Sequence, residues 1–458
     1  MIFTLLISCQ SSISVQNDPK FQVQNGILQN DSGKQALLRG FNARINGIFD
    51  VTFDDGRIPL EAIPVFEQID CQFFSEQLGL NLLRLPVNWS GIEPEDDVYN
   101  EEYLDHVFRL VDACYEVGVY SIIDIHQDAY SKEIGEDGAP LWAIYPPPEE
   151  LLEGPLEDLE ERRASAQVLA AFSSLYRDEE NLHQAYGEMA LRLADEMQFH
   201  PGAIALELQN EPVALGQVDL LYDFYDAITE PIRQKYPDLL IVFEPDSVRN
   251  FTDFSDTNRA FGWDNAIYSP HIYTDVFENG WASQSVDDLS DSIETAQEEA
   301  VFHNAPLFVG EFGHAPHTEA GFLYIETSLA FFDQSLASWA FWVYEEYSTA
   351  AWGLYEQGEE PDTRGPLRED LADLLARPFP EFLSGELHSL DWDVAQKTLT
   401  VSLTPSGDGK HLFTAPLRAW PQGARITCDG ENVTASSPRV GRIEFLCKGQ
   451  NIVAAPVE

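Results

Sequence analysis

The stretch Ala203-Ile-Ala-Leu-Glu-Leu-Gln-Asn-Glu-Pro212 begins as an apolar run and ends with an amide, a carboxylate and a proline. A short apolar run bounded by turn residues is typical of a buried strand. Pro212 cannot donate to a ladder and restricts the residue before it, so we expect the strand to end here. Glu211 is therefore predicted to stand at the tip of a buried strand.

The same pattern recurs from Leu37 to about Arg377, with helical patterns in between. Such alternation is typical of repeated βα units and a parallel sheet. The predicted strands are Leu38 to Ala43, Asn81 to Pro86, Tyr120 to Ile125, Ala203 to Leu208, Leu240 to Glu244, Ala266 to His271, Leu307 to Glu311 and Ser338 to Val343. Eight is the number that a closed (β/α)8 TIM barrel requires, so we expect this fold.

Helices are predicted between and after these strands, and the one from Glu102 is well defined because its apolar residues recur at the three and four spacing of one buried face. The helices expected are Val65 to Leu78, Glu102 to Val117, Leu182 to Gln198, Leu220 to Lys235, Val286 to Phe302, Gly321 to Gln334 and Pro366 to Leu375. Two insertions, Asp50 to Glu61 and Gln127 to Glu180, are predicted on the active-site face of the barrel.

The pattern changes after Arg377 to short strands with polar turns, and Lys397 to Leu403 alternates at period two. We therefore expect an α/β chain in three parts. Residues 1–29 form a signal-like or flexible segment, 30–377 the barrel, and 378–458 a small β-sandwich that either packs on the barrel or binds carbohydrate.

The net charge of −52, from 26 basic and 78 acidic residues, excludes nucleic acid as a partner, because phosphate contacts need clustered Lys and Arg. The acidic surface itself is interpreted as a solubility device, as in a salty habitat, and not as part of the chemistry. Past the first few positions no apolar run reaches the roughly 18 residues of a membrane-spanning helix.

The amino terminus has an apolar run from Ile2 to Ile7, followed by Ser8 and Cys9. It is similar to a bacterial lipoprotein signal, although it lacks a basic start and the run is short; the alternative is a frayed terminus. We expect a secreted or lipid-anchored monomer at a bacterial cell surface, with membrane association through its substrate or an acylated Cys9.

Four further cysteines suit an exported chain. Cys428 and Cys447 are predicted to form a disulfide, whereas Cys71 and Cys114 are either bridged or two buried thiols. No CxxC occurs and no histidines fall in a metal spacing, so neither a metal nor another cofactor is expected.

Polar and aromatic residues stand at the carboxyl ends of most predicted strands, the rim where barrel enzymes collect catalytic groups. They are Arg84, His126, Asn210 with Glu211, His271 with Tyr273, Glu311 and Trp342. Glu211 follows the fourth strand and Glu311 ends the seventh, so we expect the two to face each other across the barrel mouth.

Two carboxyls about 5 Å apart suit retaining glycoside hydrolysis, in which one attacks the anomeric carbon and the other donates a proton to the leaving oxygen. Glu211 is predicted to give and take the proton, and Asn210 to bind a sugar 2-hydroxyl. His271 and Tyr273 are expected to orient Glu311, and Arg84 to lower its pKa. Trp342 offers a flat face for a sugar ring.

Several segments together resemble glycoside hydrolase family 5 of clan A, over about Leu37 to Glu346: LRGFN, LLRLPVNW, IDIHQDAYS, LELQNEP, YSPHIY, FVGEFG and WAFWVYEE. The resemblance implies Glu211 as acid/base and Glu311 as nucleophile.

Within that family the chain looks most like the endoglycoceramidases, which cleave the bond between the oligosaccharide and the ceramide of glycosphingolipids. The marks are HQDAYS at 126–131, IGEDGAPLW at 134–142, and a sandwich entered through Arg377-Pro-Phe-Pro. The resemblance implies that Gln127 and Asp128 contact the first sugar. FNARINGIFDVTFDDGR at 41–57 is longer and more acidic than expected, which leaves the choice of sugar open.

Two other functions remain open. A family 5 endo-β-glucanase or β-glucosidase would act on soluble β-glycans or glycosides, but a long open cleft needs exposed tryptophans and the first 180 residues contain only Trp89 and Trp142. A surface lectin without turnover would not need both Glu211 and Glu311. The apolar residues Leu141 to Tyr145 are either one wall of a ceramide groove or an ordinary lid.

Overall fold

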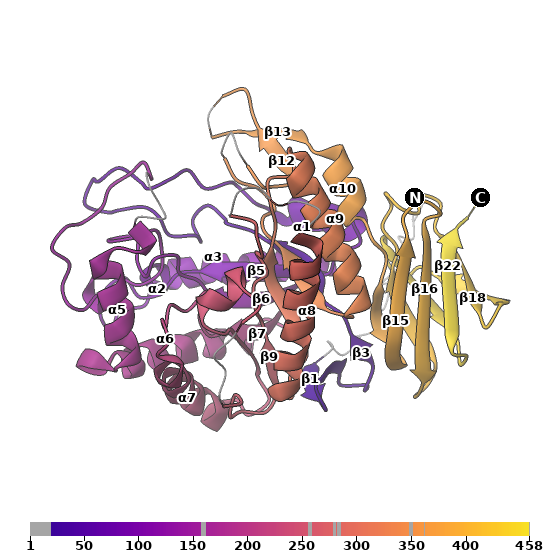
Figure 1. The fold of residues 1–458 in the computed structure, drawn as a ribbon, viewed down its shortest axis with the longest axis horizontal. Helices are drawn as coiled ribbons and strands as arrows, with labels where there is room; N and C mark the ends of the chain where they lie inside the picture. The colour runs from indigo at the N-terminus through magenta and orange to yellow at the C-terminus, as the bar shows by residue number, and fades with distance from the viewer. Residues whose placement is uncertain are drawn as a thin grey trace, which may run out of the picture.

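The computed structural model describes residues 20–156, 162–254, 259–277, 281, 285–347, 351–360 and 362–457. Its central sheet has eight parallel strands in the order β10-β11-β4-β5-β6-β7-β8-β9. Parallel bridges Tyr268↔Leu307 and Ile272↔Phe312 join the two end strands, so the sheet closes. The predicted (β/α)8 barrel is confirmed (Figure 1). The strands are β4 Arg39–Asn42, β5 Leu82–Val87, β6 Tyr120–Ile125, β7 Ala203–Glu207, β8 Leu240–Phe243, β9 Ala266–Tyr268, β10 Phe308–Phe312 and β11 Ser338–Phe341.

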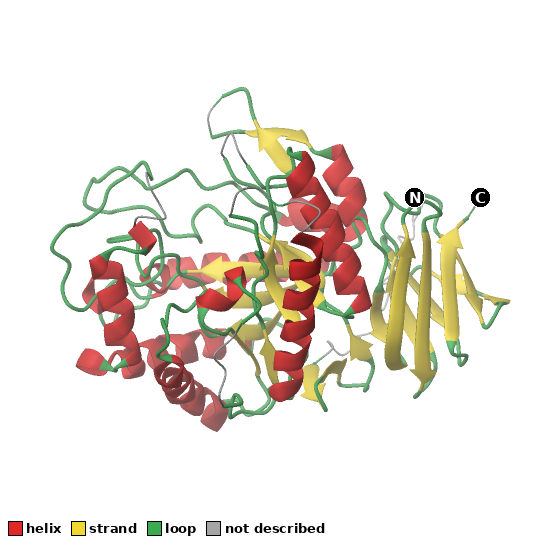
Figure 2. Cartoon of the chain, viewed as in Figure 1, coloured by secondary structure: helices red, strands yellow, loops and turns green. Residues whose placement is uncertain are grey.

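Helices surround this sheet (Figure 2), and each predicted helix is present to within one turn at either end. In α3, Asn100 caps the first turn by accepting from the Tyr103 backbone N–H, and an apolar stripe including Leu104, Val107 and Val111 is buried. The helices are α1 Gln68–Glu76, α3 Glu101–Glu116, α6 Leu182–Met197, α7 Val218–Lys235, α8 Ser285–Phe302, α9 Glu319–Gln334 and α10 Glu369–Leu375. The short α2 (Trp89–Ile92) follows β5, and α5 (Ala166–Tyr176) lies in the long insertion after β6.

The amino-terminal segment differs from the prediction. Residues 1–29 were expected to be signal-like or flexible, but β1 (Phe21–Gln24) and β2 (Ile27–Asn30) form a hairpin with positive φ at Asn25 and Gly26. Asn-Gly is the preferred pair for such a turn. Phe21 packs its ring against Tyr120, 5.0 Å away between centroids, and so covers the amino-terminal end of the barrel. Residues 1–19, including the predicted acylation site Cys9, lie outside the described residues.

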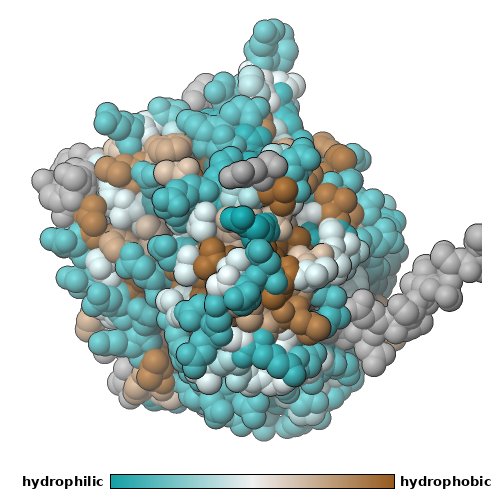
Figure 3. Space-filling model, turned by 90° about the vertical axis from the view of Figure 1, so that its right-hand side faces the viewer, coloured by the Kyte–Doolittle hydropathy of each residue, from teal (hydrophilic) through white to brown (hydrophobic). Residues whose placement is uncertain are grey.

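Two antiparallel sheets form the carboxy-terminal β domain. The hairpin and β3 (Gln35–Ala36) extend a sheet made with β14 (Pro380–Leu383), β17 (Lys410–Thr414), β21 (Arg442–Leu446) and β20 (Ala435–Ser436). The other sheet contains β15 (Gly385–Asp393), β16 (Thr398–Pro405), β22 (Asn451–Pro456), β18 (Ala424–Cys428) and β19 (Glu431–Val433). Hydrophilic residues predominate on the face that Figure 3 shows, with hydrophobic residues in smaller groups between them.

Two disulfides link elements that are distant in sequence. Cys71 in α1 joins Cys114 in α3, and Cys428 in β18 joins Cys447 just after β21. The predicted disulfide between Cys428 and Cys447 is thus present. Cys71 and Cys114, for which a bridge or two thiols were expected, are bridged. A small sheet of β12 (Tyr355–Gln357) and β13 (Arg364–Leu367) stands beside α10. Among the residues described, none of the helices is both long and apolar enough to cross a membrane.

Candidate active site

The structure brings the two predicted glutamates together at the carboxyl ends of the strands. Glu311 lies in β10, and Glu211 follows β7 by four residues. His271 stands between them, with Nδ1 3.0 Å from Glu211 Oε1 and 3.5 Å from Glu311 Oε2. One oxygen of each carboxylate and a nitrogen of His271 all lie within 4.8 Å of one another. This spacing suits the direct attack of a retaining glycosidase, for which the carboxyl groups are roughly 5 Å apart.

Glu311 is held by two strong donors. Arg84 Nη1 donates to its Oε1 at 2.8 Å and the Tyr273 hydroxyl to its Oε2 at 2.8 Å. Burial nevertheless raises the pKa of Glu311, with His271 and Arg84 acting against that rise. Arg84 was expected to lower this pKa. It acts in that direction, but the loss of hydration outweighs it.

Glu211 has a φ of 40°, in the left-handed region that non-glycine residues seldom adopt. Asn250 Nδ2 donates to its Oε1 at 3.0 Å, and its own backbone N–H donates to Glu244 Oε2 at 3.1 Å. Burial acts to raise the pKa of Glu211, but the hydrogen bond and charge of His271 lower it. Contacts from the segments that follow β8 and β9 thus hold Glu211, whose backbone conformation is strained.

These directions make Glu211 the more acidic carboxyl, the reverse of the order that an acid/base and a nucleophile require. The order depends on His271, because its Nδ1 is only 0.5 Å closer to Glu211 than to Glu311. Glu311, by contrast, keeps donors from Arg84 and Tyr273 that favour its ionised form. A shift of the imidazole hydrogen bond toward Glu311 would place the proton of the pair on Glu211.

A buried charge network lies beneath the pair. The Arg84 guanidinium, fully buried, donates to Glu207 Oε2 at 2.7 Å, to Asn210 Oδ1 at 2.8 Å and to Glu244 Oε1 at 3.2 Å, and lies 3.1 Å from Asp124 Oδ2. It thus supplies positive charge among the buried carboxyl groups around it. The predicted residues Arg84 and Asn210 are here joined directly.

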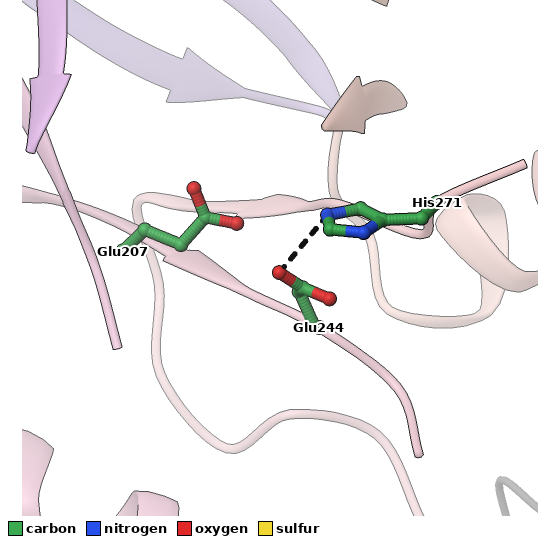
Figure 4. A group of neighbouring side chains, drawn as sticks. All are labelled: Glu207, Glu244 and His271. Carbon is green, nitrogen blue, oxygen red and sulfur yellow. Dashed lines mark ion pairs between the residues drawn. The ribbon is translucent and has the colours of Figure 1, made fainter. Parts of the chain in front are cut away.

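His271 links this network to the glutamates. Its Nε2 lies 3.1 Å from Glu244 Oε1, the ion pair drawn in Figure 4, where Glu207 stands alongside. Burial acts to lower the pKa of His271, but Glu244 and Glu311 raise it well above its ordinary value. Glu207, Glu244 and His271 lie close enough together to bind a cation. The Arg84 guanidinium already forms ion pairs with Glu207 and Glu244. Neither Glu244 nor Asn250 was predicted as a site residue. A glutamate after an apolar strand is usually an ordinary solvated charge, and Asn250 lies in a short 3₁₀ helix outside the strands.

The residues predicted to bind the first sugar divide into two groups. Trp342 stacks on His126 with 5.8 Å between centroids and 5° between planes, and His126 Nδ1 lies 2.6 Å from Asp124 Oδ2. Asp128 lies beside them, 3.5 Å from His126 Nε2. The side-chain amide of Gln127, in contrast, hydrogen-bonds to the protein backbone. Its Nε2 donates to Asn210 O at 2.7 Å, and its Oε1 accepts from Tyr130 N at 2.8 Å. Gln127 thereby helps to fix the loop that carries Glu211, and its contact with the first sugar stays a prediction.

The insertion after β6 packs in part on the barrel, while Leu141 is 44% exposed. Trp142 packs edge-on against Trp89 at 5.3 Å and donates to Glu93 O, and Ile144 is buried.

A run of aromatic rings begins beside Glu311, on the β9 side of the site. Tyr273 contacts Phe277 at 5.7 Å, and Phe277 contacts Trp352 at 5.7 Å and Phe251 at 5.6 Å. Phe277 is 57% exposed and Phe251 45%, so the run reaches solvent.

Comparisons with known proteins agree with this geometry. The chain is 23% identical to endoglycoceramidase I of Rhodococcus hoagii (strain 103S) over 409 residues, covering 83% of this chain and 78% of that protein. A crystal structure of an endogalactoceramidase shares the fold with a TM-score of 0.79 at 22% identity, covering 96% and 100% of the two chains. Endo-glycoceramidase II from Rhodococcus sp. in complex with ganglioside GM3 gives 0.78 at 20% identity, covering 94% and 99%. A family model described as cellulase (glycosyl hydrolase family 5) matches residues 62–348, more than half of the chain, and the chain therefore belongs to glycosyl hydrolase family 5.

Proposed function

We propose that this enzyme is a retaining endo-β-glycosidase that releases the intact glycan from a glycosphingolipid. The observation that carries the proposal is the aromatic run from Tyr273, hydrogen-bonded to Glu311, to the exposed Phe277 and Phe251. An apolar aglycone leaving beside the catalytic pair needs such a surface. Similarity to proteins named endoglycoceramidases supports this substrate class.

The proposed mechanism uses both glutamates twice. Glu311 attacks the anomeric carbon while Glu211 protonates the departing oxygen, and Glu211 then removes a proton from the water that releases the glycan. His271, charged and within 3.5 Å of both carboxylates, balances the negative charge that shifts between them. Trp342 and His126 form the platform for the sugar on the glycone side.

The test is to incubate the purified protein with lactosylceramide in detergent, beside a soluble β-glucan, and to identify the products by mass. We expect free lactose and intact ceramide. Release of galactose alone, with glucosylceramide left behind, or hydrolysis of the glucan alone would leave the family assignment standing and refute cleavage at the ceramide bond.

We also propose export to the cell surface. Two disulfides are usual in an oxidising compartment and rare in the cytosol of most organisms, which supports this location. Acylation of Cys9 would add a membrane anchor. Mass spectrometry of the protein from its native host should find a chain that begins at acylated Cys9, and an unmodified full-length chain in the cytosol would contradict the proposal.

A further inference from the structure

The glycone side of the site is bordered by four carboxyl groups, here called the acidic rim: Glu61, Asp128, Glu136 and Glu346. Arg44 joins this rim to the sugar platform, because its guanidinium carbon lies 6.0 Å from the centroid of the Trp342 ring. Asp128 is a second link between the acidic rim and the sugar platform, because it contacts His126. The rim therefore lies within reach of the first or second sugar from the cleaved bond.

Each arginine of the rim already serves carboxylates of the protein. Arg44 pairs with Glu61 at 2.6 Å and with Glu346 at 3.5 Å. Arg163 pairs with Asp128 at 2.7 Å and with Glu136 at 3.4 Å. Four carboxyls thus share two guanidinium groups, and an anionic group on the glycan would have to displace one of them.

Two neighbouring cations, Lys132 and Arg57, are also paired with carboxylates. Lys132 Nζ lies 2.6 Å from Asp50, and Arg57 lies 2.6 Å from Glu133 and 2.8 Å from Asp55. On the loops described around the glycone side, each of these cations has at least one carboxylate partner. The net charge of −52 adds a repulsive field around the whole molecule.

The acidic rim can instead form hydrogen bonds with uncharged sugar hydroxyl groups. His126 Nε2 is buried and makes no hydrogen bond within the described part of the chain, although Asp128 Oδ2 is 3.5 Å away. A hydroxyl group can accept from that nitrogen and donate to that carboxylate at once.

We propose that the acidic rim makes this enzyme selective for uncharged glycans, and that it rejects a sulfate or sialic acid carried on the second sugar. The inference rests on the proposed glycosidase site but not on its lipid substrate. A relative crystallised with ganglioside GM3 makes the sialylated head group the sharpest comparison.

Binding is measured first, so that the result does not depend on turnover. Calorimetry with Glu311→Gln protein compares lactose, 3′-sulfolactose and 3′-sialyllactose. We expect the two anionic sugars to bind at least about tenfold more weakly than lactose at low salt. The difference should shrink in about 1 M NaCl, where the Debye length falls to about 3 Å. Equal affinities for the three sugars would overturn the proposal.

A variant then tests the rim itself. Glu61→Gln combined with Glu346→Gln frees Arg44, and should narrow the ratio of lactose to sulfolactose affinity by about threefold or more. Asp54→Asn is the matched control, because it removes a negative charge from the same loop without freeing an arginine, and should leave the ratio unchanged. An unchanged ratio in the double variant would refute the rim as the cause. Failure to cleave lactosylceramide, with the sugar preference intact, would refute only the lipid substrate.

Discussion

Asn250 connects Glu211, the proposed acid/base, to the rest of the site. Its Nδ2 donates to Glu211 Oε1 at 3.0 Å, its Oδ1 accepts from the backbone N–H of His271 at 3.3 Å, and its carbonyl accepts from Tyr273 N at 2.8 Å. One buried amide thus fixes the acid/base carboxyl relative to the two side chains that contact Glu311. We interpret Asn250 as a positioning residue.

Asn250→Asp tests that role. The variant keeps the acceptor for the His271 N–H but places a negative charge beside Glu211, which raises the pKa of Glu211. Activity that requires protonated Glu211 is lost on the basic side, so the basic limb of the kcat/KM profile should move to higher pH by about one unit. Asn432→Asp, an exposed asparagine of β19, is the charge control. A lower rate with an unmoved basic limb would mean that Asn250 is only structural.

The two glutamates are predicted to differ when substituted. Glu311→Gln should abolish hydrolysis of every substrate while sugar binding persists, because no nucleophile remains. Glu211→Gln should slow hydrolysis by about 10²–10⁴-fold, and its glycosylation step should be least affected for aryl glycosides whose leaving group needs no proton. Burst kinetics with a dinitrophenyl lactoside separate the glycosylation step from the hydrolysis step in each variant. Comparable turnover in Glu311→Gln would refute the assignment.

At the scale of the elements, β10 approaches the end of β9 closely at Gly310. A Cβ there would lie 2.6 Å from Ser269 Oγ and 2.9 Å from His271 Nε2. Gly310→Ala should therefore displace the imidazole, lowering kcat about 10–100-fold and destabilising the fold by about 1–3 kcal/mol. In α6, Gly187→Ala is the matched control, since its nearest neighbour would be 3.6 Å away. Full activity in Gly310→Ala would show that His271 tolerates the shift.

The barrel strands could be predicted from sequence because each is a short apolar run, and β5, β6 and β7 are buried along their whole length. The β1–β2 hairpin was missed despite its Asn25-Gly26 turn, because Phe21 acquires its partners only when the barrel end is assembled. Asn250 lies in a short 3₁₀ helix, Ser247–Phe251, and its contacts reach residues 21 and 39 positions away, which no local pattern reveals.

The whole molecule combines an acidic surface with an acidic interior around the site. Several buried carboxyls there have pKa values that burial raises, among them Glu61, Glu136, Asp137, Glu244 and Glu311. Such groups favour the folded state when they are protonated. Together with the net charge of −52, whose self-repulsion grows as carboxyls ionise, they predict that the protein is more stable at mildly acidic than at alkaline pH.

A substitution of Glu136 tests the predicted fall in stability from acidic to alkaline pH. The pKa of Glu136 is about 8 when folded against 4.5 as the ordinary value, so its stabilising contribution is fully present below about pH 4.5 and is lost as pH rises toward 8. Glu136→Gln stays neutral, and should lose less stability than the wild type between pH 5 and pH 8, by up to a few kcal/mol. Thermal unfolding at the two pH values gives the comparison, with the exposed Glu356→Gln as control. Parallel loss of Tm in wild type and Glu136→Gln would mean that the Glu136 carboxyl ionises as readily in the fold as in the unfolded chain.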